Sequence, residues 1–292
     1  MTNSIGIIGA NGFLGRSMSS HFSLKDCELD LIDRDKFNKI LVDSMYESIA
    51  QNDYLFWLAT SVNPMTAQSN ISLMEKDLHD FEKFLLGLRQ SRRETPIAVV
   101  LASSGGCVYS GSDSPFSEES EALGSNAYGR FKRAQEKILE SSGIPNVIVR
   151  ASNVYGPGQP IGKGQGVIAE WIEAKTRFET VKLYGDISAT RDFLYIDDFL
   201  GAIEKIMAQK ILGTINIGSG IPTSLGDVLK CIDSLTDTPL QVDYLVQRDV
   251  DRKDYSLNIS KAKNILGWTP KISLAEGIKR THDFKSSGTS KL

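Results

Sequence analysis

A chain of 292 residues is long enough to bury a full hydrophobic core, so one large domain or two unequal domains are expected. The formal net charge of −3 gives no broad positive field for nucleic acid, and no apolar run is long enough to span a membrane. The three cysteines, Cys27, Cys107 and Cys231, lie far apart without metal-type spacing, which favours a cytoplasmic protein that has neither disulfides nor a metal centre.

Short apolar runs alternate with amphipathic segments over the first half of the chain. This alternation is typical of an α/β protein, in which helices cover a parallel sheet. We expect strands at residues 4–8, 28–32, 39–42, 54–58, 97–102 and 146–150, and helices at residues 13–22, 43–51, 70–90 and 127–142.

A glycine-rich turn of the form G-x-x-G-x-x-G directly follows the first expected strand and precedes an apolar-periodic helix. The first glycine allows a tight turn, the second lets the backbone approach a pyrophosphate, and the third lets helix and strand pack closely. The free N–H groups at the start of the helix can then bind the diphosphate of a dinucleotide. The predicted cofactor-binding residues of this turn are Gly9, Asn11, Gly12, Phe13, Leu14 and Gly15.

Asp33 lies at the end of the second expected strand, eighteen residues after Gly15. A carboxylate at this point can accept hydrogen bonds from both adenosine ribose hydroxyls. It would repel the additional 2′-phosphate of NADP, although Arg34 beside it could partly offset the repulsion. The predicted cofactor is therefore NAD rather than NADP, and Ala59, which follows the expected strand at 54–58, is included in its site.

Tyr128 and Lys132 are four residues apart in the helix expected at residues 127–142, so they share one helix face. A phenol with its ordinary pKa of about 10 is too weakly acidic to act as a base at neutral pH. A nearby ammonium group and an oxidised nicotinamide ring both favour the phenolate and lower that pKa. The pair therefore predicts a tyrosine that transfers protons beside a dinucleotide.

Glycine and proline crowd into residues 156–166 and interrupt the alternation of strands and helices. A smaller second unit is expected to begin there. We expect a Rossmann-type, doubly wound parallel sheet with the NAD site in residues 1–155 and a mainly substrate-binding domain in residues 156–285. A segment around residues 186–207 is expected to pack back on the first domain, and residues 286–292 to form a disordered tail.

Further motifs continue through nearly the whole chain after the glycine turn and the Tyr128/Lys132 pair. They are SSGGCVY at 103–109, RASNVYGP at 150–157, YGD at 184–186, TRDFLYIDD at 190–198, ISKA at 259–262 and LGWTP at 266–270. In this order the motifs resemble the extended short-chain dehydrogenase/reductase family and, within it, the NAD-dependent epimerase/dehydratase branch. The resemblance implies an enzyme that acts on a nucleotide-diphosphate sugar.

The resemblance also implies roles for individual residues. Tyr128 is the expected base, and Lys132 both lowers its pKa and holds the nicotinamide ribose. Asn153 would contact the nucleotide end of the substrate, while Arg191 and Arg248 would bind its diphosphate, because a guanidinium group can pair with two phosphate oxygens at once. For Arg248, a solvated loop in a charged segment is the alternative. The family further implies a homodimer formed through two helices of each subunit.

The chain departs from the family pattern at Gly105, where members usually carry a catalytic Ser or Thr. Ser104 is the predicted replacement, although adjacent side chains in a regular strand point to opposite faces. Gly106 and Cys107 take the positions of an Asp–Glu pair in sugar 4,6-dehydratases, which argues against loss of water. Without a histidine partner, Cys107 is expected to be a packed thiol. Asp77 stands where the family often has Asn at the cofactor wall.

The leading hypothesis is an NAD-dependent nucleotide-sugar 4-epimerase that transiently oxidises C4 of the sugar. The alternative is a reductase of an NDP-4-keto-6-deoxyhexose that consumes NADH or NADPH, and the rather short chain favours it. Asp33 favours the epimerase. A non-catalytic nucleotide-binding module is the third possibility, and only Gly105 supports it. The sequence leaves the nucleotide and the sugar open.

Overall fold

The computed structural model describes residues 3–91, 98–111, 114–162, 166–246 and 254–287. The chain divides into two compact units, and the division crosses the sequence several times instead of following one cut. The first unit comprises Met1–Ser110, Glu121–Arg150 and Ile203–Ile215, and the second comprises Gly111–Ser120, Ala151–Ala202 and Asn216–Leu292.

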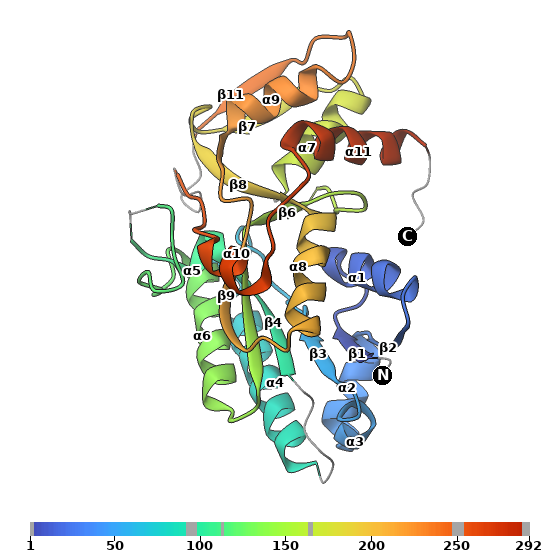
Figure 1. Ribbon diagram of the computed structural model, residues 1–292. Helices are drawn as coiled ribbons and strands as arrows, with labels where there is room; N and C mark the ends of the chain where they lie inside the picture. The colour runs from blue at the N-terminus through green and yellow to red at the C-terminus, as the bar shows by residue number, and fades with distance from the viewer. Residues whose placement is uncertain (1–2, 92–97, 112–113, 163–165, 247–253, 288–292) are drawn as a thin grey trace. The chain divides into compact units, whose positions relative to one another are not determined.

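A six-stranded sheet with the order β2-β1-β3-β4-β5-β9 forms the centre of the first unit (Figure 1). β1 pairs in parallel with β2 on one side and with β3 on the other, and β3 pairs in parallel with β4. The strand order reverses at β1, which is where open α/β sheets bind ligands. The strands are β1 (Asn3–Ile8), β2 (Cys27–Ile32), β3 (Tyr54–Trp57), β4 (Ala98–Ser104), β5 (Asn146–Ala151) and β9 (Gly213–Ile217).

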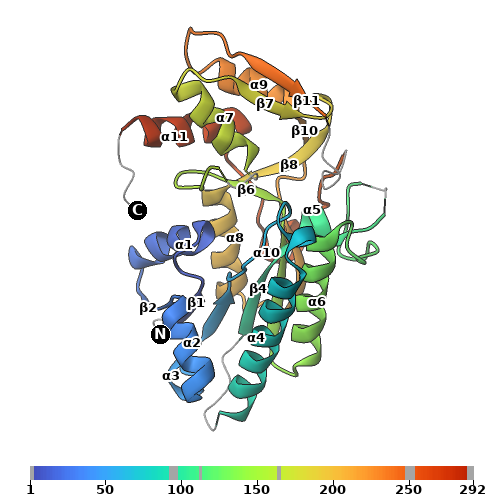
Figure 2. The same cartoon turned by 180° about the vertical axis from the view of Figure 1, so that it is seen from behind.

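The sheet is flanked by helices, of which α4 and α6 lie side by side (Figure 2). α4 buries Phe81, Phe84, Leu85 and Leu88 at helical spacing. The ring of Trp57 on β3 lies 4.5 Å from that of Phe81 and 5.3 Å from that of Phe84, so the helix is fixed to the sheet by aromatic packing. The helices are α1 (Phe13–Ser23), α2 (Arg34–Asp43), α3 (Tyr46–Ile49), η1 (Ala67–Ser69), α4 (Ile71–Gln90), α5 (Gly105–Val108) and α6 (Ala127–Ser141).

The strand expected at residues 39–42 is wrong, because this segment is the second half of α2. Asp33 caps the helix by accepting a hydrogen bond from the backbone N–H of Lys36 at 2.8 Å. Phe37 and Ile40 are buried at helical spacing. A short apolar run cannot distinguish a strand from a buried helix segment by periodicity alone.

The second unit contains two small sheets and several helices. β8 pairs antiparallel with β10 and parallel with β6, while β7 and β11 form a parallel pair. α7, α9 and α11 pack on one another. The boundary between the two units falls inside α8, whose residues up to Ala202 belong to the second unit and whose residues from Ile203 belong to the first. The elements are β6 (Asn153–Tyr155), α7 (Val167–Thr176), β7 (Val181–Tyr184), β8 (Thr190–Tyr195), α8 (Ile196–Ala208), β10 (Pro222–Ser224), α9 (Leu225–Asp233), β11 (Val242–Leu245), α10 (Ser260–Leu266) and α11 (Leu274–Ser286).

A membrane-spanning helix and a metal site each have requirements that the described residues do not meet. Within the described ranges, no helix is both long and apolar enough to cross a bilayer. The same part of the chain contains no group of three or more His, Cys, Asp or Glu side chains arranged to hold a metal ion. The tail expected at residues 286–292 begins inside α11 at Ser286, and residues 288–292 lie outside the described part.

Candidate active site

Close backbone contacts explain why two of the glycines in the turn after β1 cannot carry a side chain. Gly9 has a φ of +91°, and an added Cβ would lie 2.8 Å from the backbone nitrogen of Ala59. A Cβ on Gly15 would lie 2.3 Å from the carbonyl oxygen of Gly9. A Cβ on Gly12 would instead meet only that oxygen, at 3.3 Å. Gly9 and Gly15 are therefore required by the turn itself, whereas Gly12 leaves space where a ligand can approach the backbone.

The start of α1 offers hydrogen-bond donors beside this space. Gly12 is the residue that caps the helix, and no side-chain capping hydrogen bond is made there. The first backbone N–H groups, including those of Phe13 and Leu14, have no partner within a helix. Arg16 closes the first turn by donating to the carbonyl of Gly12 at 2.9 Å, and its guanidinium donates to the carbonyl of Asn11 at 2.5 Å. These groups fit a diphosphate.

Asp33 is exposed at the end of β2. Its Oδ1 accepts the capping hydrogen bond from Lys36, and we find no bond to Oδ2 from any described residue. The second oxygen is therefore open to ribose hydroxyls, and the role of Asp33 in binding them stays a prediction. The turn and Asp33 together fit a dinucleotide whose adenosine ribose carries no additional phosphate.

Tyr128 and Lys132 lie one turn apart near the start of α6. Asn126 caps this helix by accepting from the N–H of Gly129 at 2.8 Å. The Nζ of Lys132 lies 5.8 Å from the ring centre of Tyr128. The same Nζ donates to the carbonyl oxygen of Ala102 on β4 at 3.0 Å. The structure therefore brings the predicted pair together and ties it to the carboxyl end of a central strand.

Burial sets the ionisation of both side chains. It lowers the pKa of Lys132 from 10.5 to about 8, although the carboxylates of Asp77 and Glu136 act in the opposite direction. Burial also raises the pKa of the Tyr128 hydroxyl, and the neighbouring Cys107 adds to the increase. The expected lowering of the Tyr128 pKa by Lys132 is therefore not produced by the protein groups alone. An oxidised nicotinamide ring beside the phenol would supply the further positive charge that a phenolate needs.

Ser104 ends β4 and is partly exposed, whereas Ser103 is buried and donates to Glu136 Oε1 at 2.5 Å. Ser103 is thus already engaged, and its hydroxyl is not available to a substrate. No side-chain capping bond ties Ser104 to α5. Ser104 remains the predicted substitute for the hydroxyl missing at Gly105.

Cys107 packs against the start of α6. A Cβ on Gly129 would lie 1.9 Å from the carbonyl oxygen of Cys107, so the two backbones touch only because residue 129 is glycine. The N–H of Ser125 donates to the same carbonyl at 2.8 Å, and Asn126 Nδ2 lies 3.8 Å from the thiol sulfur. Cys107 is therefore fixed beside Tyr128, a contact that its distance in sequence did not predict.

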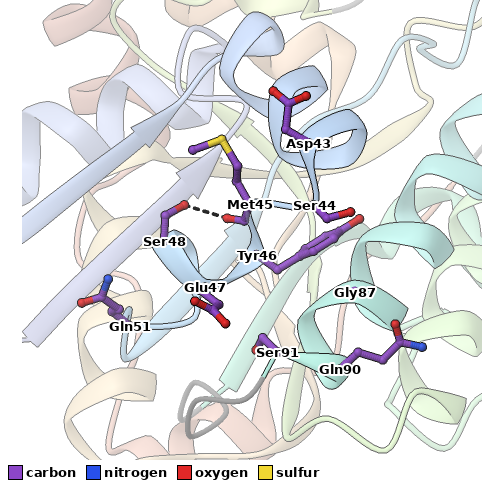
Figure 3. A pocket seen from close by; sticks show the side chains of 10 residues that line it. All are labelled: Asp43, Ser44, Met45, Tyr46, Glu47, Ser48, Gln51, Gly87, Gln90 and Ser91. Carbon is purple, nitrogen blue, oxygen red and sulfur yellow. Dashed lines mark hydrogen bonds between the residues drawn. The ribbon is translucent and has the colours of Figure 1, made fainter.

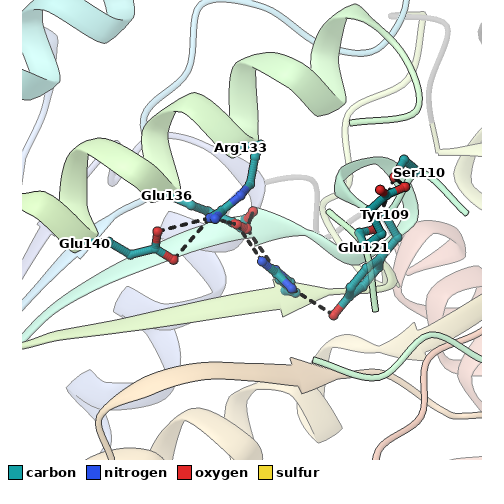
Figure 4. A network of polar contacts seen from close by, with 8 residues as sticks. Tyr109, Ser110, Glu121, Arg133, Glu136 and Glu140 are labelled. Carbon is teal, nitrogen blue, oxygen red and sulfur yellow. Dashed lines mark hydrogen bonds and ion pairs between the residues drawn. The ribbon is translucent and has the colours of Figure 1, made fainter. Parts of the chain in front are cut away.

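Sequence reasoning also missed a buried charge network one turn further along α6 (Figure 4). Glu136 is fully buried and accepts from Arg150 at 2.8 and 3.1 Å and from Arg133 at 2.9 Å. Arg150 also donates to the hydroxyl of Tyr109 at 3.2 Å. The signal was present in the sequence, because the four-residue spacing of Tyr128 and Lys132 continues to Glu136.

Two predicted substrate-binding residues lie on neighbouring strands of the second unit. Asn153 begins β6 and is in register with Phe193 on β8. Arg191 lies on β8 two residues before Phe193, and its NH1 donates to the carbonyl of Thr190 at 2.8 Å. Arg248 lies outside the described residues. The proposed roles of these three residues stay predictions.

A separate hollow of about 630 Å³ lies elsewhere in the first unit, around α3 and the end of α4 (Figure 3). It contains none of the predicted site residues. An added Cβ on Gly87 would lie 2.1 Å from the Tyr46 ring, so this glycine is explained by packing. The lining residues are Asp43, Ser44, Met45, Tyr46, Glu47, Ser48, Gln51, Gly87, Gln90 and Ser91.

The central parallel sheet and the glycine turn between β1 and α1 are those of a dinucleotide-binding α/β protein. The chain belongs to the NAD dependent epimerase/dehydratase family, which it matches over residues 5–218. This confirms three predictions from the sequence, namely the family, the Rossmann-type fold class and NAD as the cofactor.

Relatives of the chain have names that describe different reactions. The chain is 32% identical to the putative UDP-glucose 4-epimerase of Methanocaldococcus jannaschii over 73% of each protein. It is 26% identical to the UDP-N-acetyl-alpha-D-glucosaminuronate decarboxylase of Bacillus cytotoxicus, over 94% of this chain and 95% of that protein. It is also 26% identical to the dTDP-4-dehydro-6-deoxyglucose reductase of Escherichia coli, over 95% of this chain and 96% of that protein. Similarity alone therefore does not select the reaction.

The fold has clear counterparts among solved structures. The UDP-glucose 4-epimerase of Thermus thermophilus, solved with NAD, matches with a TM-score of 0.85 and 24% identity. The match covers 97% of this chain and 99% of that one. At this level of identity the likeness shows the shared fold.

Proposed function

We propose that the protein is an NAD-dependent nucleotide-sugar 4-epimerase. The observation that carries the proposal is the pair formed on α6 by the partly buried Tyr128 and the buried Lys132, in the same unit as a glycine turn and an Asp33 that fit NAD. A relative named as a putative UDP-glucose 4-epimerase supports the substrate class. Asn153, Arg191 and Arg248 are the proposed contacts to the nucleotide and diphosphate.

The proposed reaction is a reversible oxidation at C4 of the sugar. Tyr128 removes the proton of the C4 hydroxyl, and Lys132 stabilises the resulting phenolate as an ammonium group. Bound NAD+ would supply the acceptor for the C4 hydride and then return it. The keto sugar turns over between the two transfers, so hydride reaches its opposite face and Tyr128 returns the proton. No net cofactor is consumed.

The segment before Tyr109 supports a reaction in which the sugar loses no water. Eliminating water from the sugar needs a carboxylic acid and a carboxylate near the reacting carbons. Gly106 and Cys107 provide neither, and Gly105 is buried at the start of α5. An epimerase needs only one proton carrier, and Tyr128 can serve in both directions.

Reduction of a 4-keto sugar nucleotide is the second candidate, because a relative named as a dTDP-4-dehydro-6-deoxyglucose reductase matches over nearly the whole chain. The same Tyr128 would then donate a proton to the C4 oxygen while the reduced cofactor donates hydride. This reaction uses the cofactor stoichiometrically, and epimerisation does not.

Product analysis separates the candidates. Purified protein is incubated with UDP-glucose, UDP-N-acetylglucosamine, UDP-glucuronate or a dTDP-4-keto-6-deoxyglucose, while NADH absorbance is followed and products are separated by chromatography. We expect C4 epimers without net change in NADH. Stoichiometric loss of NADH would establish the reductase instead, and release of CO2 from UDP-glucuronate would establish a decarboxylase. No conversion of any sugar nucleotide would contradict an enzymatic role.

A further inference from the structure

The ammonium group of Lys132 is bonded in the structure by two neutral oxygens. Lys132 is 5% exposed, and its Nζ donates to Ala102 O at 3.0 Å and to Gln135 Oε1 at 3.1 Å. Ala102 contributes a backbone carbonyl, which any residue at that position would provide. Gln135 contributes a side chain, and it lies one turn after Lys132 on the same face of α6.

We propose that Gln135 is a positioning residue that holds the Lys132 ammonium beside Tyr128 and keeps it protonated. The contact between Gln135 and Lys132 is a property of the fold. Its effect on turnover rests on the proposed function, in which Lys132 stabilises the Tyr128 phenolate. Gln135 does not touch the reacting atoms, so its effect is transmitted through Lys132.

The environment of Gln135 favours this role over simple packing. The side chain is fully buried, and its Nε2 has no hydrogen-bond partner among the described residues. A buried donor without a partner costs free energy, and an apolar side chain of similar size would avoid that cost. Turning the amide over would place its N–H groups against the ammonium of Lys132, so the lysine fixes its orientation. The hydrogen bond that Oε1 accepts from Lys132 therefore explains why a glutamine occupies this buried position.

The carboxylates near Lys132 form their hydrogen bonds with other groups, so the side chain that binds its ammonium group is the amide of Gln135. On α6, Glu136 is occupied by Arg133 and Arg150. On α4, Asp77 accepts from the N–H of Ser61 at 2.6 Å and from its hydroxyl at 2.7 Å. Tyr128 on α6 faces Lys132 with its ring, and β4 offers the Ala102 carbonyl.

A neutral acceptor holds the cation without neutralising its charge. A carboxylate in the same place would form an ion pair and draw the positive charge away from Tyr128. An apolar residue would leave Nζ with one acceptor, and burial would then favour the uncharged amine more strongly. Gln135 therefore keeps Lys132 charged and available to its neighbours. Its loss should lower the pKa of Lys132, and a carboxylate should raise it.

Competitive labelling with trace acetic anhydride tests the inference on the full-length protein. Only the unprotonated amine reacts, so the yield of acetylated Lys132 peptide against pH, measured by mass spectrometry, gives its pKa. The variants are Gln135→Leu and Gln135→Glu. Gln90→Leu is the matched control, because Gln90 is exposed at the far end of α4.

We expect the Lys132 titration to move down by about one pH unit in Gln135→Leu, a tenfold change in proton affinity, and to move up in Gln135→Glu. Gln90→Leu should titrate like the unchanged protein. The alkaline limb of turnover should move in the same direction in each variant. If Gln135→Leu does not fold, Gln135→Glu carries the test. An unchanged Lys132 titration in a folded Gln135 variant would overturn the inference, whereas failure of every sugar substrate would overturn only the proposed function.

Discussion

Lys132 and Glu136 lie one turn apart on the same face of α6, and both are charged side chains that the fold buries. Glu136 accepts hydrogen bonds from two arginines and from Ser103. Lys132 is bonded only by neutral oxygens in the described structure, and burial lowers its pKa to about 8. Of these two buried charges on one helix, Glu136 is paired with opposite charges and Lys132 is bonded by neutral groups.

We interpret this difference as that between a structural charge, Glu136, and the charge with the proposed catalytic role, Lys132. The Glu136 network joins α6 to β4 and β5, so it fixes the helix on the sheet. The pKa of Arg150 is raised, because its bonds to Glu136 and Tyr109 outweigh burial, which alone would lower it. At Lys132 the carboxylates of Asp77 and Glu136 offset burial only in part, and the hydrogen bonds of the ammonium group go to neutral oxygens. Reactive groups are expected where charge is incompletely compensated.

The largest effect is expected from removing the phenol. In Tyr128→Phe the proton carrier is lost, so turnover should fall by about 10²–10⁴-fold. The affinity for NAD should change little, because the glycine turn and Asp33 remain. Steady-state kinetics and cofactor titration measure the two quantities. Near-normal turnover would show that Tyr128 is not the acid/base group.

Removing the structural charge should reduce stability. In Glu136→Leu, Arg150 is left buried without its carboxylate, and the free energy of unfolding should fall by about 3–5 kcal/mol. Denaturant unfolding measures the loss. The double variant Glu136→Leu/Arg150→Met is the control, and it should recover much of the stability because both charges of the buried pair are removed together. A single variant as stable as the unchanged protein would mean that the network does not hold α6.

Removing the charge of Lys132 should affect turnover strongly and stability little. Lys132→Met eliminates a buried cation together with its desolvation cost, so we expect the free energy of unfolding to change by less than about 1 kcal/mol. Turnover should nevertheless be nearly abolished. A loss of stability as large as that of Glu136→Leu would erase the distinction between the two charges.

The same contrast predicts a pH dependence of stability. The folded pKa of Lys132 is about 8 and its ordinary value is 10.5, so between these values the unfolded chain binds more protons than the folded chain. The Lys132 contribution to stability should therefore rise with pH across this window, and its cost should be fully present below about pH 8. Unfolding free energies of the unchanged protein and Lys132→Met, compared at several pH values, measure it. A difference that is constant with pH would contradict the lowered pKa.

The smallest effect is expected at the cofactor turn, away from both charges. Asp33→Asn keeps the oxygen that caps α2 but loses the carboxylate, so NAD should bind about tenfold more weakly. Discrimination against NADP should also decrease, because the repulsion of its phosphate is removed. Cofactor titration followed by fluorescence measures both changes. Equal affinities in the variant and the unchanged protein would remove Asp33 from the site.

The parts of the candidate site that could be predicted from the sequence depend on short-range geometry. Gly9 to Gly15 form one turn, and Tyr128 and Lys132 lie one helical turn apart, so spacing alone places them. Gln135 and Glu136 act through contacts with Lys132, Arg150 and β4, and their partners depend on how α6 packs on the sheet. The ionisation of Tyr128 was missed for the same reason, because burial is set by packing. The helix over residues 39–42 was missed because a short apolar run fits either period.

The fate of the hydrogen at C4 shows whether the sugar is epimerised by hydride transfer. UDP-glucose carrying deuterium at C4 is converted by the protein in ordinary water with NAD+, and the recovered sugar nucleotides are examined by mass spectrometry and NMR. We expect a C4 epimer that retains deuterium at C4, formed by the unchanged protein and not by Tyr128→Phe. A C4 epimer that has exchanged its deuterium for solvent hydrogen would contradict hydride transfer at C4 and with it the role assigned to the Tyr128/Lys132 pair.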